Sequence, residues 1–141
     1  MKLEVAQKIL SAALAHARAR SMLPLVVAVL DARGAPRALA AEDGTSLRRS
    51  DIAVGKAHGA LAMGLGSRTL FKRAEAQPYF IAAVTHAVGG SLIPVPGGVL
   101  IRDSAGTLVG AIGISGDTSD NDEAAAIAGI EAAGLKADPG A

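Results

Sequence analysis

The chain contains no cysteine and no tryptophan, and only two phenylalanines and one tyrosine. Without cysteine, disulfides, thiolate catalysis, cysteine-ligated zinc and iron–sulfur clusters are excluded. The shortage of aromatic side chains removes the stacking platforms that single-stranded nucleic acid binders use. The net charge is +1, and no long run of either sign supplies the basic surface that a phosphate backbone requires. Nucleic acid is therefore not an expected partner.

Long apolar runs are also missing. The longest early one, Leu25–Leu30, is far short of the roughly 20 residues that cross a bilayer. Residues 1–20 mix charges with apolar side chains at helical spacing, unlike a signal peptide. We expect a cytoplasmic protein with no membrane partner. Half of the 141 residues are apolar, which predicts a single domain over residues 1–141, with a loose tail from about residue 136.

Apolar periodicity and turn signals predict the secondary structure. Helices are expected at residues 2–21, 47–64, 68–77 and 120–133, with Ser46 and Ser67 as N-caps of the second and third. Residues 79–88 are ambiguous between helix and coil. Strands are expected at residues 25–30, 36–41, 92–95, 99–102 and 108–114. Runs of strands interrupted by helices indicate an α+β fold with a largely antiparallel sheet.

The segment Gly110–Glu123 combines a glycine-rich turn with four acids, Asp117, Asp120, Asp122 and Glu123. Its glycine spacing is not that of a dinucleotide or phosphate loop, and the acids would repel a phosphate. A calcium loop fails because Asp122 and Ala128 stand where glycine and glutamate are required. A capping box between Asp120 and Glu123 explains the pattern best. Asp117, Asp122 and Glu123 remain candidates for the wall of a pocket.

The second helix has an unusual row of small residues. Gly55, Gly59, Ala62 and Gly66 recur beside a face that carries His58, and each interior glycine costs a helix about 1 kcal/mol. Something is therefore expected to approach this helix closely: a strand, another helix or a flat ligand. Neither His58 nor the other two histidines has the spacing of a preformed metal site, so no metal is expected. The turn Pro94–Gly98 either presents backbone N–H groups to a carboxylate or simply connects two strands.

Taken in order, several short motifs resemble the GlcG/HbpS-like haem-degrading domain family over nearly the whole chain. They are Val29–Gly34, Glu42–Gly44, Lys56–Ala57, Pro96–Gly98, Gly110–Gly116, Asp122–Glu123 and Ala128–Gly129. The resemblance implies a profilin-like α/β/α fold, a five-stranded antiparallel sheet with helices on both faces. It also implies homo-oligomers, and it includes members that bind haem or act in small-molecule catabolism. The family's Lys-Ala-Tyr-Thr-Ala is Lys56–Ala60 here, with Gly59 in place of threonine, and His58 could supply a different axial ligand. The family's Arg-Met-Asp-Gly has become Ala41–Gly44, so Arg48 or Arg49 would have to replace the lost guanidinium.

Three functions are consistent with these features. The first is a small-ligand-binding protein, with haem or a related cofactor held by His58. The second is an enzyme acting on a hydroxy- or oxo-carboxylate, with Lys56 or His58 as acid and base. The third is a structural or regulatory oligomer in which the glycine row is a subunit contact. The expected pocket lies between the second helix and the proline–glycine turn, and its candidate residues are His58, Gly59, Pro96, Gly97, Gly98, Asp117, Asp122 and Glu123.

Overall fold

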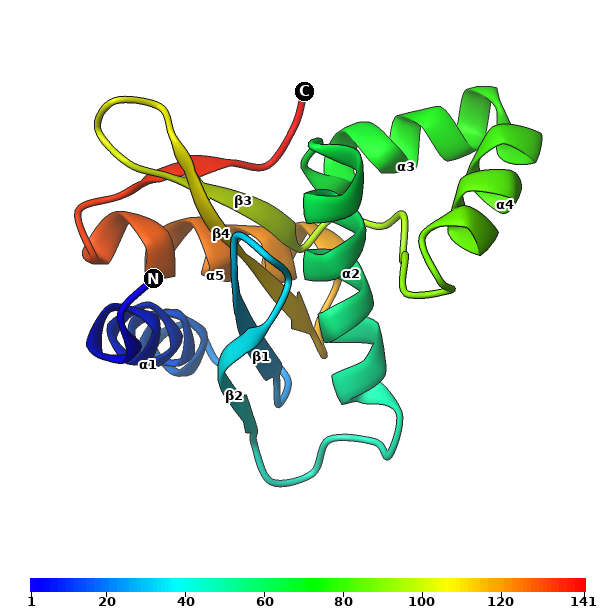
Figure 1. The fold of residues 1–141 in the computed structure, drawn as a ribbon. Helices are drawn as coiled ribbons and strands as arrows, with labels where there is room; N and C mark the ends of the chain where they lie inside the picture. Colours follow the sequence, from blue (N-terminus) through cyan, green and yellow to red (C-terminus); the bar gives the residue numbers. More distant parts are fainter.

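The computed structural model describes residues 1–141 and contains five helices and one five-stranded sheet (Figure 1). The helices are α1 (Leu3–Ala19), α2 (Arg49–Met63), α3 (Ser67–Ala76), α4 (Pro78–Ala87) and α5 (Ser119–Ala132). The strands are β1 (Val26–Asp31), β2 (Pro36–Ala41), β3 (Gly98–Arg102), β4 (Leu108–Ser115) and β5 (Lys136–Asp138). The strand order is β2-β1-β4-β3-β5, and every neighbouring pair is antiparallel. The predicted α+β class is confirmed.

Helices cover both faces of the sheet. Helices α1 and α5 lie on one face, and α2 crosses the other (Figure 1). The side chains of β1 alternate between the layers: Val27 and Val29 belong to the large core under α1 and α5, whereas Ala28 and Leu30 pack towards α2. Helices α3 and α4 extend to one side and form a smaller cluster around Leu70. None of the helices combines the length and apolarity required to cross a bilayer.

The fifth strand is not the one that the sequence predicts. Leu92–Val95 is apolar but forms no strand, because it packs on α2 instead of on the sheet: Ile93 N–H donates to Gly55 O at 3.1 Å. Pro94 also lacks the N–H that a strand ladder requires. The sheet edge is instead completed by β5, which pairs with β3. The chain from residue 136 was expected to be loose, but its end is held against α3, where Arg68 N–H donates to Pro139 O at 3.2 Å.

Several predicted caps are also wrong. Helix α2 begins at Arg49 and has no side-chain cap, so Ser46 does not cap it. Ser67 lies inside α3, and its Oγ accepts from Gly98 N at 2.7 Å, which ties α3 to the start of β3. The ambiguous segment after Gln77 forms helix α4, which Pro78 begins.

The predicted capping box of α5 is likewise absent. Thr118 is the N-cap, and its hydroxyl accepts from Asn121 N. Asp120 and Glu123 both bind Arg68 of α3 instead, the former at 2.6 Å. The spacing of the two acids fits a capping box, but a guanidinium from a distant element takes both carboxylates.

Candidate functional site

The close approach of α2 to the sheet positions the candidate site. Gly98 of β3 and Gly113 of β4 are cross-strand partners on the face that α2 covers. A Cβ on Gly113 would overlap the carbonyl oxygen of Ala53, and one on Gly98 would overlap that of Lys56. The two glycines therefore form a flat strip on which the helix backbone rests. This contact places Lys56 at the corner between β4 and α5.

Lys56 and Asp122 form a buried ion pair at this corner. Lys56 Nζ donates to Ile114 O at 2.8 Å and to Asp122 Oδ2 at 3.2 Å. The two side chains are only 3% and 2% exposed. The other oxygen of Asp122 accepts from Asp117 N at 3.0 Å, so both charges are satisfied within the protein. Two candidate residues that lie 66 positions apart in the sequence thus meet in one contact.

Burial shifts the ionisation of both partners towards their neutral forms. Removal from water lowers the pKa of Lys56, and the attraction of Asp122 opposes this change. Removal from water likewise raises the pKa of Asp122, against the attraction of Lys56. Burial thus favours release of the lysine proton, and Asp122 opposes that release. Such a pair is suited to passing a proton to a bound molecule.

A cavity of about 310 Å³ opens beside this pair. Its polar lining includes Lys56, Asp122, Asp117, Ser115 and Arg49, and its apolar wall includes Ile52 and Ile93. Arg49 Nη1 donates to Ser115 Oγ at 3.2 Å. The sequence singles out Arg49 only as a possible replacement for a family arginine, and no pattern in it selects Ser115.

Asp117 lines the cavity, but its carboxylate accepts hydrogen bonds from other groups of the protein. It accepts from Leu23 N, Thr118 N and Asn121 Nδ2, each at 2.7 Å. These bonds, the one from Leu23 first, hold the pKa of Asp117 below its ordinary value. Asp117 therefore joins the segment before β1 to the start of α5 and fixes the corner.

Replacing Asp117 with asparagine is expected to lower stability at neutral pH, because an amide oxygen accepts these bonds more weakly than a carboxylate does. A depressed folded pKa gives stability that is complete above the ordinary value of 3.8 and is lost as the pH falls through the folded value. The difference between Asp117→Asn and wild type should therefore shrink in acid. Melting temperatures followed by circular dichroism from pH 7 to about pH 2 test this. Asp43→Asn, in an exposed loop, is the control, and a difference that stays constant with pH would contradict the assignment.

Glu123, Pro96, Gly97 and Gly98 do not line the cavity, although Val95 of the same proline–glycine turn does. Glu123 accepts from Arg68 Nε through both oxygens at 3.1 Å, which fastens α3 to α5. The N–H of Gly98 is taken by Ser67, so it is not free for a ligand carboxylate. Gly97 instead covers the lysine, and a Cβ there would lie 3.0 Å from Lys56 Nζ. Pro96 lines a separate depression with Arg68.

His58 lies on another side of α2 and does not line the Lys56 cavity. Its Nδ1 is 2.7 Å from the carbonyl oxygen of Ser91. Because a carbonyl oxygen can only accept, Nδ1 carries the proton, and Nε2 is left as the atom with a free lone pair. The ring also lies beside the β1–β2 turn, since a Cβ added to Gly34 would lie 3.5 Å from His58 Cδ2.

The glycine row is filled by the chain itself. A Cβ on Gly59 would lie 2.9 Å from Leu92 Cγ and 3.0 Å from its Cα, and one on Gly55 would lie 2.6 Å from Ile93. The segment before β3 is therefore what approaches the helix closely. This packing closes the space beside Gly59, whereas Gly55 also lines an open depression of about 630 Å³ between the first half of α2 and residues 89–93.

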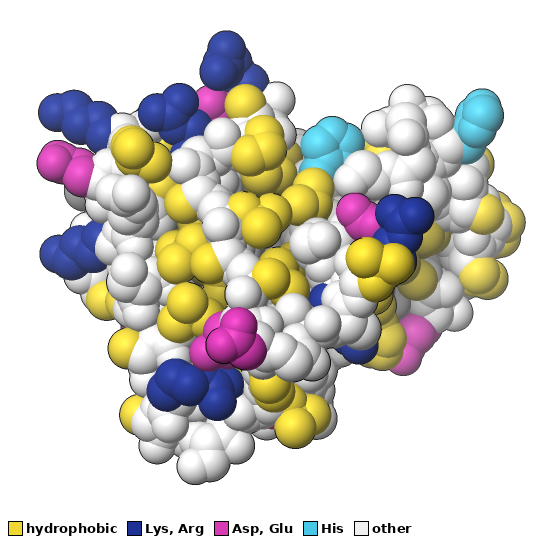
Figure 2. Space-filling model, turned by 90° about the horizontal axis from the view of Figure 1, so that it is seen from below, with side chains coloured by type: hydrophobic (Ala, Val, Ile, Leu, Met, Phe, Trp, Pro, Cys, Tyr) yellow, Lys and Arg dark blue, Asp and Glu magenta, His cyan; other side chains and the backbone are white.

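The face that carries His58 remains open and apolar. Val54 and Leu61 flank His58 at helical spacing, and all three are half-buried. Leu39 of β2 pairs with Ala28, which packs towards α2, so Leu39 faces the same side and is 48% exposed. Figure 2 shows hydrophobic side chains gathered over the middle of the face seen from below, with a histidine beside them. A free Nε2 beside an apolar surface has the chemistry of a haem ligand. No group of three or more His, Asp and Glu side chains is placed to hold a metal ion.

Comparison with known proteins identifies relatives of this fold and site. A family model described as haem-degrading protein HbpS-like matches residues 1–131. No curated protein matches the chain. A crystal structure of a PduOC:haem complex superposes with a TM-score of 0.84 at 25% identity, over 96% of each chain. A double mutant of HbpS from Streptomyces reticuli has a TM-score of 0.78 at 28% identity, over 93% of this chain and 85% of that one. Klebsiella pneumoniae protein ORFY, at 21% identity and a TM-score of 0.83, shares the fold over 95% of this chain and 90% of its own.

Proposed function

The chain belongs to the HbpS-like haem-degrading protein family, and from this membership we propose that it binds haem, with His58 Nε2 as the axial ligand of the iron. The observation that carries the proposal is the 2.7 Å contact between His58 Nδ1 and Ser91 O, which fixes the ring and leaves Nε2 free. The similarity to the PduOC:haem complex supports the choice of ligand. Bound haem would supply the iron. This chain's own residues hold the ring of His58 and offer an apolar surface.

A backbone carbonyl is an effective second partner for such a histidine. Metal-ligating histidines commonly donate their other N–H to a carbonyl or carboxylate, which orients the ring and raises the basicity of the ligating nitrogen. Val54 and Leu61 lie on either side of His58 along the helix and would contact the macrocycle. Haem would lie on the open face of α2 and not in the depression of about 630 Å³ between α2 and residues 89–93, because His58 does not line that depression.

Titration with hemin tests this proposal. Wild type is expected to shift the Soret band, and His58→Ala should weaken binding at least tenfold, because the axial bond is lost. His16→Ala and His86→Ala, in α1 and α4, are matched controls that should bind as wild type does. Absence of a Soret shift in wild type would end the haem proposal. A Soret shift in His58→Ala equal to that of wild type would mean that a residue other than His58 ligates the iron.

An enzyme acting on a hydroxy- or oxo-carboxylate is a second candidate, favoured by the buried Lys56–Asp122 pair beside a cavity. Lys56 would exchange a proton with the substrate, and Asp122 would hold it in place. Screening turnover of a panel of small hydroxy- and oxo-carboxylates, with Lys56→Ala as the inactive comparison, tests this function.

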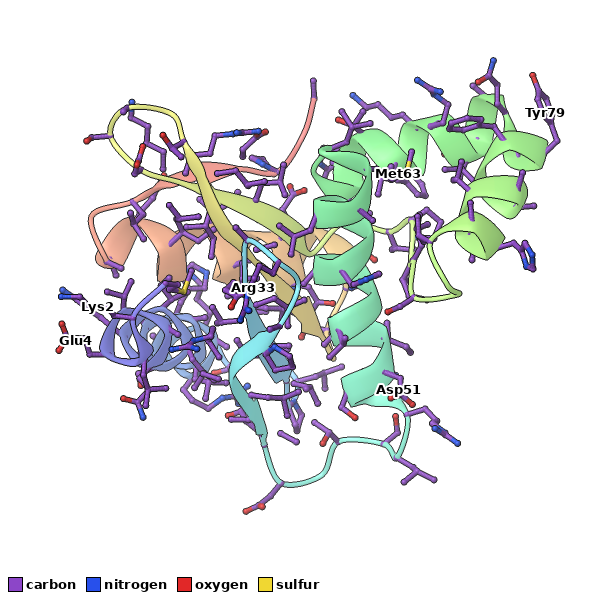
Figure 3. The ribbon with its side chains drawn as sticks, viewed as in Figure 1. Lys2, Glu4, Arg33, Asp51, Met63 and Tyr79 are labelled. Atoms are coloured by element: carbon purple, nitrogen blue, oxygen red, sulfur yellow. The ribbon has the colours of Figure 1, made fainter.

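We also propose that the chain forms a homo-oligomer, as the family resemblance implies, and that it acts in the cytoplasm. Large apolar side chains on the surface are consistent with subunit contacts: Leu47 is 88% exposed and Tyr79, which projects from α4 in Figure 3, is 72% exposed. Sedimentation velocity tests the assembly, and cell fractionation tests the location.

A further inference from the structure

We propose that the cavity beside Lys56 is a second ligand site, separate from His58, which binds a small carboxylate carrying an oxygen on its second carbon, a 2-oxo or 2-hydroxy acid. Arg49 would hold the carboxylate, and Lys56 and Ser115 would face the neighbouring oxygen. The proposal builds on the second candidate function, whose cavity it shares, and it names the ligand. It requires only binding, so it depends neither on haem nor on turnover.

Arg49 is a guanidinium without a carboxylate partner. Its single side-chain hydrogen bond goes to Ser115 Oγ, and it takes part in no ion pair. Its neighbour Arg48, by contrast, pairs with Asp51, which Figure 3 shows on the outer side of α2. The remaining N–H groups of Arg49 form a planar fork that matches a carboxylate. The cavity wall therefore carries donors that no acceptor in the chain uses.

The acids of the cavity do not supply the missing acceptor. Asp122 accepts from Lys56 and from the N–H of Asp117. Asp117 accepts from two backbone N–H groups and from Asn121. Both carboxylates are thus engaged on the protein side of the wall. The excess of free donors favours an anion in this cavity over a cation.

The dimensions of the cavity limit the ligand to a small molecule. Its volume of about 310 Å³ is at the lower end of the 300–1,000 Å³ that is usual for ligand sites. Ile52 and Ile93 supply an apolar wall for a short carbon chain. Haem is larger than the ligands that a cavity of this size holds. We therefore place haem on the open face that carries His58 and not in the cavity beside Lys56.

Two groups beside Arg49 are placed to recognise the second oxygen. Lys56 Nζ uses two hydrogen bonds, to Ile114 O and Asp122, and an ammonium group has a further N–H to donate. Ser115, only 1% exposed, receives a bond from Arg49, and its own hydroxyl hydrogen is free to turn towards the cavity. A carbonyl or hydroxyl next to the carboxylate would meet these donors, so an acid without that oxygen should bind more weakly.

Binding is tested with sodium pyruvate and sodium lactate by calorimetry and by amide chemical-shift perturbation. Hydroxyacetone, which keeps the carbonyl but lacks the carboxylate, is the neutral comparison, and propionate lacks the second oxygen. We expect wild type to bind at least one of the two acids, with shifts concentrated at Ser115 and Asp122. Arg49→Gln should raise the dissociation constant at least tenfold, because charge-assisted bonds are lost. The matched control Arg48→Gln should change it less than twofold.

Three results would overturn the proposal: no binding of either acid, equal binding by Arg49→Gln, or equal binding of hydroxyacetone. Arg49→Gln should still shift the Soret band of hemin, because Arg49 lies away from His58. The carboxylate site and the haem proposal can therefore fail independently. Propionate binding as tightly as lactate would remove the assigned role of Lys56 and Ser115.

Discussion

Replacing Lys56 with methionine is expected to lower the free energy of unfolding by about 3–5 kcal/mol. Methionine keeps an unbranched apolar stem but removes the ammonium group, which leaves the Asp122 carboxylate without its countercharge at 2% exposure. The carbonyl oxygen of Ile114 also loses a donor. Urea unfolding followed by circular dichroism measures the change. Arg48→Met, which breaks an exposed pair with Asp51, should cost less than about 1 kcal/mol and is the control.

The double variant Lys56→Met with Asp122→Leu separates the charge from the packing. A buried ion pair replaced by apolar side chains of similar volume is often neutral or stabilising, so the double variant should recover most of the loss. Its recovery is limited because Asp117 N–H would lose its acceptor. A loss in Lys56→Met of less than about 1 kcal/mol would mean that Asp122 is hydrated or protonated at little cost, contrary to its burial.

The same variant should show a characteristic pH dependence. Without Lys56, only the hydrogen bonds from backbone N–H groups of Asp117 and Gly116 still oppose the burial that raises the pKa of Asp122. A carboxyl group whose folded pKa is raised destabilises the fold as the pH rises above its ordinary value of 3.8 and through the folded value. The deficit of Lys56→Met is therefore largest near neutral pH and shrinks in mild acid. A deficit that is the same at pH 7 and pH 4 would indicate lost packing instead of a stranded charge.

Four of the helices and four of the strands could be predicted from the sequence, because periodicity and turn residues act locally. Residues 79–88, most of which belong to α4, are ambiguous in the sequence. The fifth strand could not be predicted. Leu92–Val95 is apolar because it packs against the glycines of α2, whereas β5 is three residues long and has no pattern that distinguishes it from coil. Two N-caps were wrongly predicted for a similar reason, because the partners of these side chains come from distant parts of the chain. The spacing of Asp120 and Glu123 is local, but Arg68, which takes both carboxylates, comes from a distant element.

Some residues of the candidate site could be predicted from the sequence, but their arrangement could not. Lys56, His58 and Asp122 are all recognisable in the sequence, yet the structure places His58 on an open face and the other two in a buried pair. Helical spacing places Lys56 and His58 on different sides of α2, since residues two apart do not share a face. The partnership of Lys56 with Asp122, and the unpaired state of Arg49, depend on how α2 crosses the sheet, which no local pattern encodes.

Gly113→Ala is expected to disrupt the fold, with a loss of more than about 4 kcal/mol. The added Cβ would meet the Ala53 carbonyl and would lie 2.9 Å from the Ala57 N, and both are backbone atoms of α2 that no side-chain rotation can move. β4 cannot yield either, because it is paired on both sides, with Gly113 opposite Ala28 of β1 and Gly98 of β3. The amount of soluble protein and its melting temperature measure the effect.

Gly55→Ala is the matched comparison, since its Cβ would meet only the Ile93 side chain, which can change its rotamer. Alanine also favours a helix over glycine by about 1 kcal/mol, which offsets part of the clash. We therefore expect Gly55→Ala to fold with a modest change in melting temperature. If Gly113→Ala were instead the milder of the two, α2 would not be resting on the sheet backbone. The position of Lys56 would then be unexplained, because the close approach of α2 to the sheet is what brings its ammonium group to Ile114 and Asp122.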